Sequence, residues 1–97
     1  MTDPLEEIAN GLKKIGSTLA ENASLTSKEK SDVVEWTKQM AIAFAVGDSN
    51  KVENYRVSLN NMLGVVELRA AQSAERAAIA MGNLALDTLI KVGIALL

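Results

Sequence analysis

The chain contains no cysteine and no histidine among its 97 residues. Without cysteine it can form neither a disulfide framework nor a thiolate metal site. Without histidine it lacks the commonest metal ligand and general base of proteins. Its carboxylates, lysines and hydroxyls follow no catalytic or metal-binding spacing, and its glycines fit no phosphate-binding loop. We therefore predict a protein that is not an enzyme and that needs neither a metal nor a cofactor.

The chain also lacks an excess of either charge. Twelve acidic and ten basic residues give a formal net charge of −2. Such a weak field does not favour a phosphate backbone or an anionic lipid surface, so nucleic acid is not an expected partner. Charged residues interrupt the first twenty positions, which excludes a cleavable signal peptide. We expect a secreted or cell-surface protein exported without one, or alternatively a cytoplasmic protein.

Aromatic residues and proline are scarce, with three of the former and one of the latter. The apolar residues make up 48% of the chain and are mostly alanine, leucine, valine, isoleucine and methionine, which favour helices. Pro4 stands at the start, where a helix tolerates proline. The composition therefore predicts an all-α fold in a single domain over residues 1–97.

Two helix starts can be read from capping residues. Asp3 before Pro4, with Glu6 three residues later, predicts a helix over 4–21 with one narrow apolar seam. The residues of that seam are Leu5, Ile8, Leu12, Ile15 and Leu19.

The second start is a Thr26 and Glu29 pair, which has the spacing of a reciprocal capping box. It predicts a helix over 27–46. Gly47 stands where a left-handed C-terminal cap is expected.

No proline or polar cluster interrupts residues 50–97. The simplest prediction is one continuous helix, roughly 70 Å long at 1.5 Å per residue. Gly64 and Gly82 would each cost about 1 kcal/mol in its interior, so a break at either glycine is the alternative.

The long C-terminal segment has a thin polar face and a wide apolar one. The polar stripe, a candidate lumen lining, consists of Arg69, Arg76, Asn83, Asp87 and Lys91. The candidate assembly interface consists of Leu68, Ala74, Ala78, Met81, Leu84, Leu86, Leu89, Ile90, Val92 and Leu96. Two shorter helices cannot cover such a face along its whole length, so the segment predicts self-association.

Small residues recur every four positions in this segment, at Ala70, Ala74, Ala78 and Gly82. The spacing would let a second helix approach closely, although alanine also simply favours helix.

Residues 79–97 are nearly long enough to cross a bilayer. Asp87 and Lys91 would each cost about 2.5–3.5 kcal/mol there, so a single span is not expected. An assembled pore that hides the polar stripe around a lumen is the membrane alternative.

The residues after the turn at 47–50 carry a resemblance. Tyr-Arg-Val-Ser-Leu-Asn-Asn-Met at 55–62 and Leu-Arg-Ala-Ala-Gln-Ser at 68–73 are similar to stretches in the small subunits of bacterial type III secretion needles and inner rods. The resemblance covers about 47–91, lacks the proline usual at the turn, and gives no counterpart for a helix over 27–46. It implies a protomer stacked helically into a hollow tube, with the C-terminal helices packed inward around a lumen.

We accordingly expect a structural protomer of a homo-oligomer, in the form of a helical filament or hollow tube through which a secreted protein could pass. A soluble adaptor or chaperone that binds a partner helix is the first alternative, and a membrane-active oligomeric pore is the second.

Overall fold

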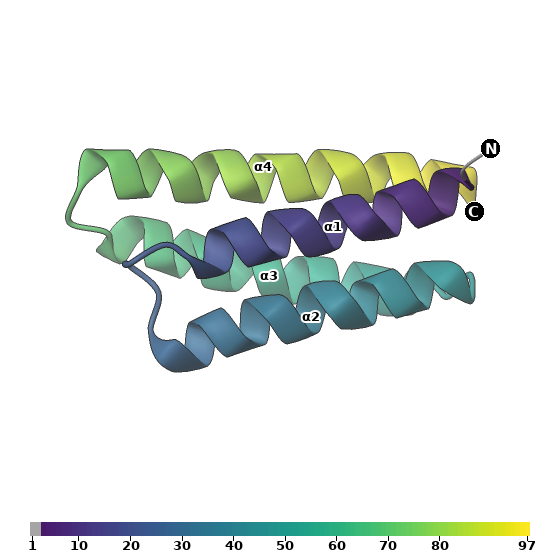
Figure 1. Cartoon of the computed structure of the whole chain (residues 1–97), viewed down its shortest axis with the longest axis horizontal. Coiled ribbons are helices and arrows are strands. Elements are labelled where there is room, and N and C mark those ends of the chain that lie inside the picture. Colours follow the sequence, from purple (N-terminus) through teal and green to yellow (C-terminus); the bar gives the residue numbers. More distant parts are fainter. Residues whose placement is uncertain (1–2) are drawn as a thin grey trace.

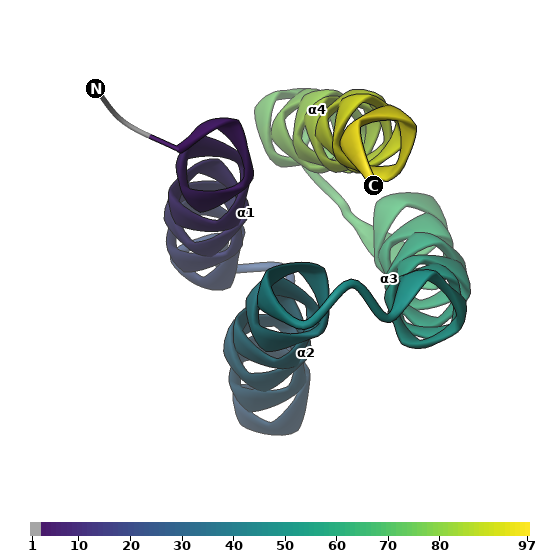
Figure 2. The ribbon, with the colours of Figure 1, turned by 90° about the vertical axis from the view of Figure 1, so that its right-hand side faces the viewer.

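The computed structural model describes residues 3–97, and that part of the chain folds into four helices. They are α1 (Pro4–Ala20), α2 (Ser27–Ala45), α3 (Ser49–Arg69) and α4 (Ser73–Leu96). Each helix runs antiparallel to the one before it, in a bundle of 41 × 23 × 19 Å (Figure 1). Seen end-on, the helices follow one another around the bundle, and α4 returns to pack against α1 (Figure 2). The predicted all-helical fold is confirmed.

The capping residues place the first two helices as the sequence predicts, within one residue at their ends. Asp3 accepts a hydrogen bond from the backbone N–H of Leu5 at 3.0 Å, and α1 begins at the following proline. Thr26 and Glu29 each accept a hydrogen bond from the other's backbone N–H, which completes the capping box of α2. Gly47 has a φ of 72° and so adopts the left-handed conformation that commonly ends a helix.

The prediction of one continuous helix over 50–97 is wrong. The chain reverses at residues 70–72, between α3 and α4, and neither Gly64 nor Gly82 breaks its helix. The reversal folds α4 back along α1, where Leu86 and Ile90 become 99% buried. Burying a side chain of this size contributes about 1.5–3 kcal/mol. Hydrophobic burial therefore favours the reversal over a straight helix, although no glycine or proline marks it.

Polar contacts between two loops hold this reversal in place. The Arg69 guanidinium donates to the Ser24 carbonyl at 2.8 Å and to the Glu29 carboxylate. The Ser24 hydroxyl donates to the Glu75 carboxylate at 2.6 Å, and the Asn22 amide donates to the Glu75 carbonyl at 3.2 Å. We call these five residues the end cluster. It ties the α1–α2 loop to the α3–α4 turn, so side chains more than forty positions away stabilise the break.

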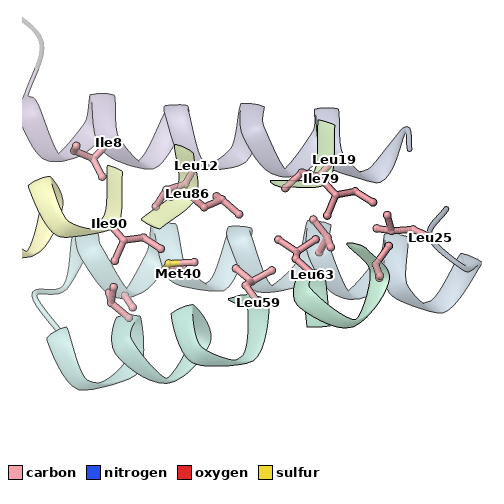
Figure 3. Packing of buried hydrophobic residues seen from close by; sticks show 14 of the residues in the cluster. Ile8, Leu12, Leu19, Leu25, Met40, Leu59, Leu63, Ile79, Leu86 and Ile90 are labelled. Carbon is pink, nitrogen blue, oxygen red and sulfur yellow. The ribbon is translucent and has the colours of Figure 1, made fainter. Parts of the chain in front are cut away.

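A single hydrophobic core runs the length of the bundle (Figure 3). Its largest fully buried side chains come from all four helices: Leu12, Val33, Met40, Phe44, Val52, Leu59, Leu63, Val66, Ile79, Leu86 and Ile90. Two glycines allow close contact between helices. A Cβ at Gly16 would lie 2.4 Å from the Thr37 hydroxyl oxygen of α2, and one at Gly82 would lie 2.4 Å from Leu19 Cδ2 of α1. Gly82 therefore sets how closely α4 approaches α1.

Candidate assembly surface on the C-terminal helix

The bundle uses only a narrow strip of α4 for its own core. The residues of α4 that are buried are Ile79, Leu86, Ile90 and Gly93. In the most apolar 18-residue stretch of this helix, only 22% of the residues are buried. A core helix of a soluble protein is mostly buried, so α4 exposes far more apolar surface than its place in the bundle requires.

The exposed apolar residues of α4 form one continuous surface, which we call the outer face. It consists of Ala74, Ala77, Ala78, Met81, Leu84, Ala85, Thr88, Val92, Ala95 and Leu96, all of them exposed. Met81 is 71% exposed and Leu84 67%, while Val92 and Leu96 are each 49% exposed. Thr88 is the one polar side chain on this face. An apolar patch of this kind is typical of an interaction site.

A groove between α1 and α4 extends the outer face. One hollow of about 470 Å³ is lined by Lys14, Ile15, Thr18, Leu19, Asn22, Ala78, Met81, Gly82 and Ala85. A second, of about 450 Å³, is lined by Ile15, Met81, Leu84, Ala85, Thr88, Leu89 and Val92. The two share Ile15, Met81 and Ala85, so they form one apolar groove along the antiparallel pair. Small residues of α4 leave this space open beside the side chains of α1.

The polar stripe does not form the free face that the sequence suggested. Arg56 of α3 donates to Asp87 at 3.0 Å, and Lys91 lies 3.1 Å from the other oxygen of Asp87. The hydrogen bond from Lys91, followed by that from Arg56, holds the pKa of Asp87 below its ordinary value. Arg56 also pairs with Glu53, whose pKa it lowers. The charged side of α4 therefore packs along α3 within the same molecule.

Two further members of the predicted stripe have other surroundings. Arg69 belongs to α3 and pairs with Glu29 of α2, so it shares no helix with the others. Arg76 donates to the Ala70 carbonyl at 2.9 Å and so helps to hold the turn. Asn83 is half-buried, and its Oδ1 has no hydrogen-bond partner among the described residues. The expectation that all five side chains line one lumen is corrected accordingly.

The structure separates the predicted interface residues into three groups. Those exposed on the outer face are Ala74, Ala78, Met81, Leu84, Val92 and Leu96. Leu86 and Ile90 belong to the core, and Leu89 is half-buried, with its Cδ2 only 2.8 Å from where a Cβ on Gly11 would lie. Leu68 is 88% exposed but belongs to α3. Leu86 and Ile90 were misassigned because a helix that is apolar almost all round does not reveal which side faces the core.

The predicted series of small residues is also divided. Ala70 is buried at the α3–α4 turn, and Gly82 contacts Leu19 of the same molecule. Ala74 and Ala78 alone remain exposed on α4. The four residues therefore do not form one stripe for a second helix.

Chemistry-bearing groups are sparse around this surface. Within residues 3–97 no group of three or more Asp, Glu, His or Cys side chains could hold a metal ion. Of the four helices described, α4 is long and apolar enough to cross a membrane. No family model matches the sequence, and no curated protein or solved structure shows significant similarity to it. The interpretation of this surface rests on its own geometry.

Proposed function

We propose that this protein is a non-enzymatic structural protomer that associates with copies of itself through the outer face of α4. One observation carries the proposal: the exposed face of α4 runs from Ala74 to Leu96 with a single polar side chain, Thr88. Covering such a face contributes about 25 cal/mol per Å² of apolar surface removed from water. Large exposed side chains, above all Met81 and Leu84, supply that surface.

The orientation of α4 in the bundle supports the same proposal. A surface helix of a soluble monomer turns its charged side to water and its apolar side to the core. In α4, Asp87 is directed toward Arg56 of α3, while Leu84 and Val92 face outward. The bundle thus satisfies the charge internally and leaves apolar residues for a partner to cover.

A matched pair of substitutions tests the proposal. Leu84→Asp places an unpaired charge in the proposed dry contact, at a cost of several kcal/mol, so this variant should be monomeric. Val34→Asp makes a comparable change at an exposed valine of α2 and should leave association unchanged. Light scattering after size exclusion measures the mass, and circular dichroism checks that both variants fold. Association of Leu84→Asp equal to that of the unmodified protein would show that the surface is misassigned.

The finer form of the proposal is a helical filament or hollow tube of the secretion-needle type, exported to the cell surface. Open helical growth needs two different contacting patches on each protomer. Val57, Val65 and Leu68 are exposed on α3 and supply a second apolar patch for such growth. Electron microscopy of the purified protein should then show uniform polymers, and Val65→Asp should shorten them without removing the α4 contact.

Two alternative functions use the same surface differently. A soluble adaptor or chaperone would receive an amphipathic helix of a partner in the α1–α4 groove, and the protein alone would be a cytoplasmic monomer. A membrane-active pore would insert α4 into a bilayer. Vesicle flotation and dye leakage distinguish the pore from both other functions.

A further inference from the structure

Side-chain size changes along the outer face of α4. The part nearer the start of the helix carries the small residues Ala74, Ala77 and Ala78. The part nearer its end carries the larger Val92 and Leu96, both about half exposed. Ala85 lies midway between Ala78 and Val92. One half of the face is therefore low and the other half is raised.

This gradient favours one direction of packing between two such faces. If two α4 helices pack antiparallel about a twofold axis at Ala85, Ala78 meets Val92 of the second copy and Ala74 meets its Leu96. Each layer then combines one small and one large side chain, which keeps the helix separation constant and leaves few voids. Parallel packing would instead place alanine on alanine at one end and leucine on leucine at the other. Antiparallel packing also brings opposite ends of the two helix dipoles together.

The area available indicates how much the second copy must cover. The 24 residues of α4 span about 36 Å at 1.5 Å per residue. A strip about 10 Å wide along this length covers roughly 360 Å², well below the ~800 Å² per partner of a standard stable interface. Including the α1 flank about doubles the width and brings the area close to that value. A stable pair therefore has to cover the α1–α4 groove as well as the helix.

We propose that the occupant of this surface is a second copy of the chain, packed antiparallel about a twofold axis close to Ala85. The inference rests on the self-association proposed above and specifies its geometry. A twofold contact is self-complementary, so it closes at two chains and leaves no α4 face free. Growth into a filament would then proceed from such pairs through the α3 patch.

The absence of cysteine from the sequence makes disulfide cross-linking a clean test. Disulfides form only when the two Cα atoms lie about 4.4–6.8 Å apart, so cross-linking reports which positions meet. Four single variants are needed: Ala78→Cys, Ala85→Cys and Val92→Cys on the outer face, and Ser31→Cys on the exposed surface of α2 as the control. Each is oxidised mildly, alone and in pairwise mixtures, and the products are weighed by mass spectrometry.

The antiparallel pair predicts a specific pattern. Ala85→Cys should convert from 10.3 kDa to twice that mass on its own. Ala78→Cys and Val92→Cys should each stay at the single-chain mass alone and should form a mixed species of double mass when combined. The double variant Ala78→Cys/Val92→Cys should stop at two chains, and Ser31→Cys should not cross-link.

Other patterns would overturn the inference. Efficient self-linking of Ala78→Cys, Ala85→Cys and Val92→Cys would mean that the helices are parallel. A series of ever larger products from the double variant would mean an open head-to-tail contact. In both cases, or if nothing cross-links while the unmodified protein still associates, the antiparallel pair fails and self-association stands. If the unmodified protein is also monomeric, the proposed function fails with it.

Discussion

At the scale of single residues, Glu29 has two roles that depend on its charge in different ways. Its carboxylate accepts the Thr26 backbone N–H at 2.8 Å and so completes the cap of α2. It also pairs with Arg69 at the end of α3. The hydrogen bond from Arg69 is the main reason that the pKa of Glu29 falls from its ordinary 4.5 to about 2. The folded state therefore holds this group ionised where an unfolded chain would begin to protonate it.

The lowered pKa predicts how stability changes in acid. A carboxyl whose pKa is lower in the folded state contributes stability that is fully present above its unfolded pKa and is lost as the pH falls through the folded value. The contribution of Glu29 should therefore be complete above pH 4.5 and should disappear between about 4.5 and 2. Urea unfolding at a series of pH values measures it. The partial exposure of Arg69 to solvent limits its size.

The variant Glu29→Gln is the control for this prediction. Glutamine keeps an oxygen that can accept the Thr26 N–H but cannot titrate. Its free energy of unfolding should fall less than that of the unmodified protein over the same acid range. Equal pH dependence of the two proteins would mean that Glu29 is not held at a lowered pKa.

The contrast between Leu84 and Leu86 shows where sequence reasoning stopped at the residue scale. The two leucines are two positions apart and lie on different sides of α4, Leu84 exposed and Leu86 in the core. A helical wheel shows that they diverge but not which one faces inward, because apolar residues occupy most of the wheel. The missing information was the reversal after α3, which brings α1 against the Leu86 side. A charge at Leu86 would therefore test folding, whereas a charge at Leu84 tests association.

At the scale of helices, local signals predicted α1 and α2 well. Asp3, the Thr26 and Glu29 pair, and Gly47 act within a few residues of the helix ends that they define. The end of α3 carries no such signal, since Ala70 and Ala71 are good helix formers and Gln72 makes no side-chain cap at the start of α4. That end depends on the end cluster and on burial across the bundle, which one sequence does not display.

Two glycines, each in the interior of a helix, should respond oppositely to the same substitution. A Cβ at Gly64 would meet only open space, so Gly64→Ala should stabilise the protein by about 0.5–1 kcal/mol by removing the entropic cost of glycine in a helix. Gly82→Ala should destabilise it, because its Cβ would lie 2.4 Å from Leu19 Cδ2. Thermal and urea unfolding measure both changes. Equal effects of the two alanines would contradict the close approach of α4 to α1.

At the scale of the whole molecule, the sequence indicated an apolar excess in the C-terminal segment, and the structure places it. Residues 50–97 form two helices rather than one, which buries part of that excess, including Leu86 and Ile90. Met81, Leu84, Val92 and Leu96 remain outside. The polar stripe was expected to face water in a lumen, yet Asp87 pairs with Arg56 within the bundle. The position of the surface could thus be predicted only in part, because its neighbours depend on the path of the chain.

Sedimentation equilibrium of the unmodified protein over a wide concentration range tests the central claim most directly. If the outer face of α4 binds a second copy, the average mass should rise from 10.3 kDa toward at least twice that value as the concentration increases. A mass that stays at 10.3 kDa at the highest concentration, in a protein that circular dichroism shows to be folded and helical, would contradict it.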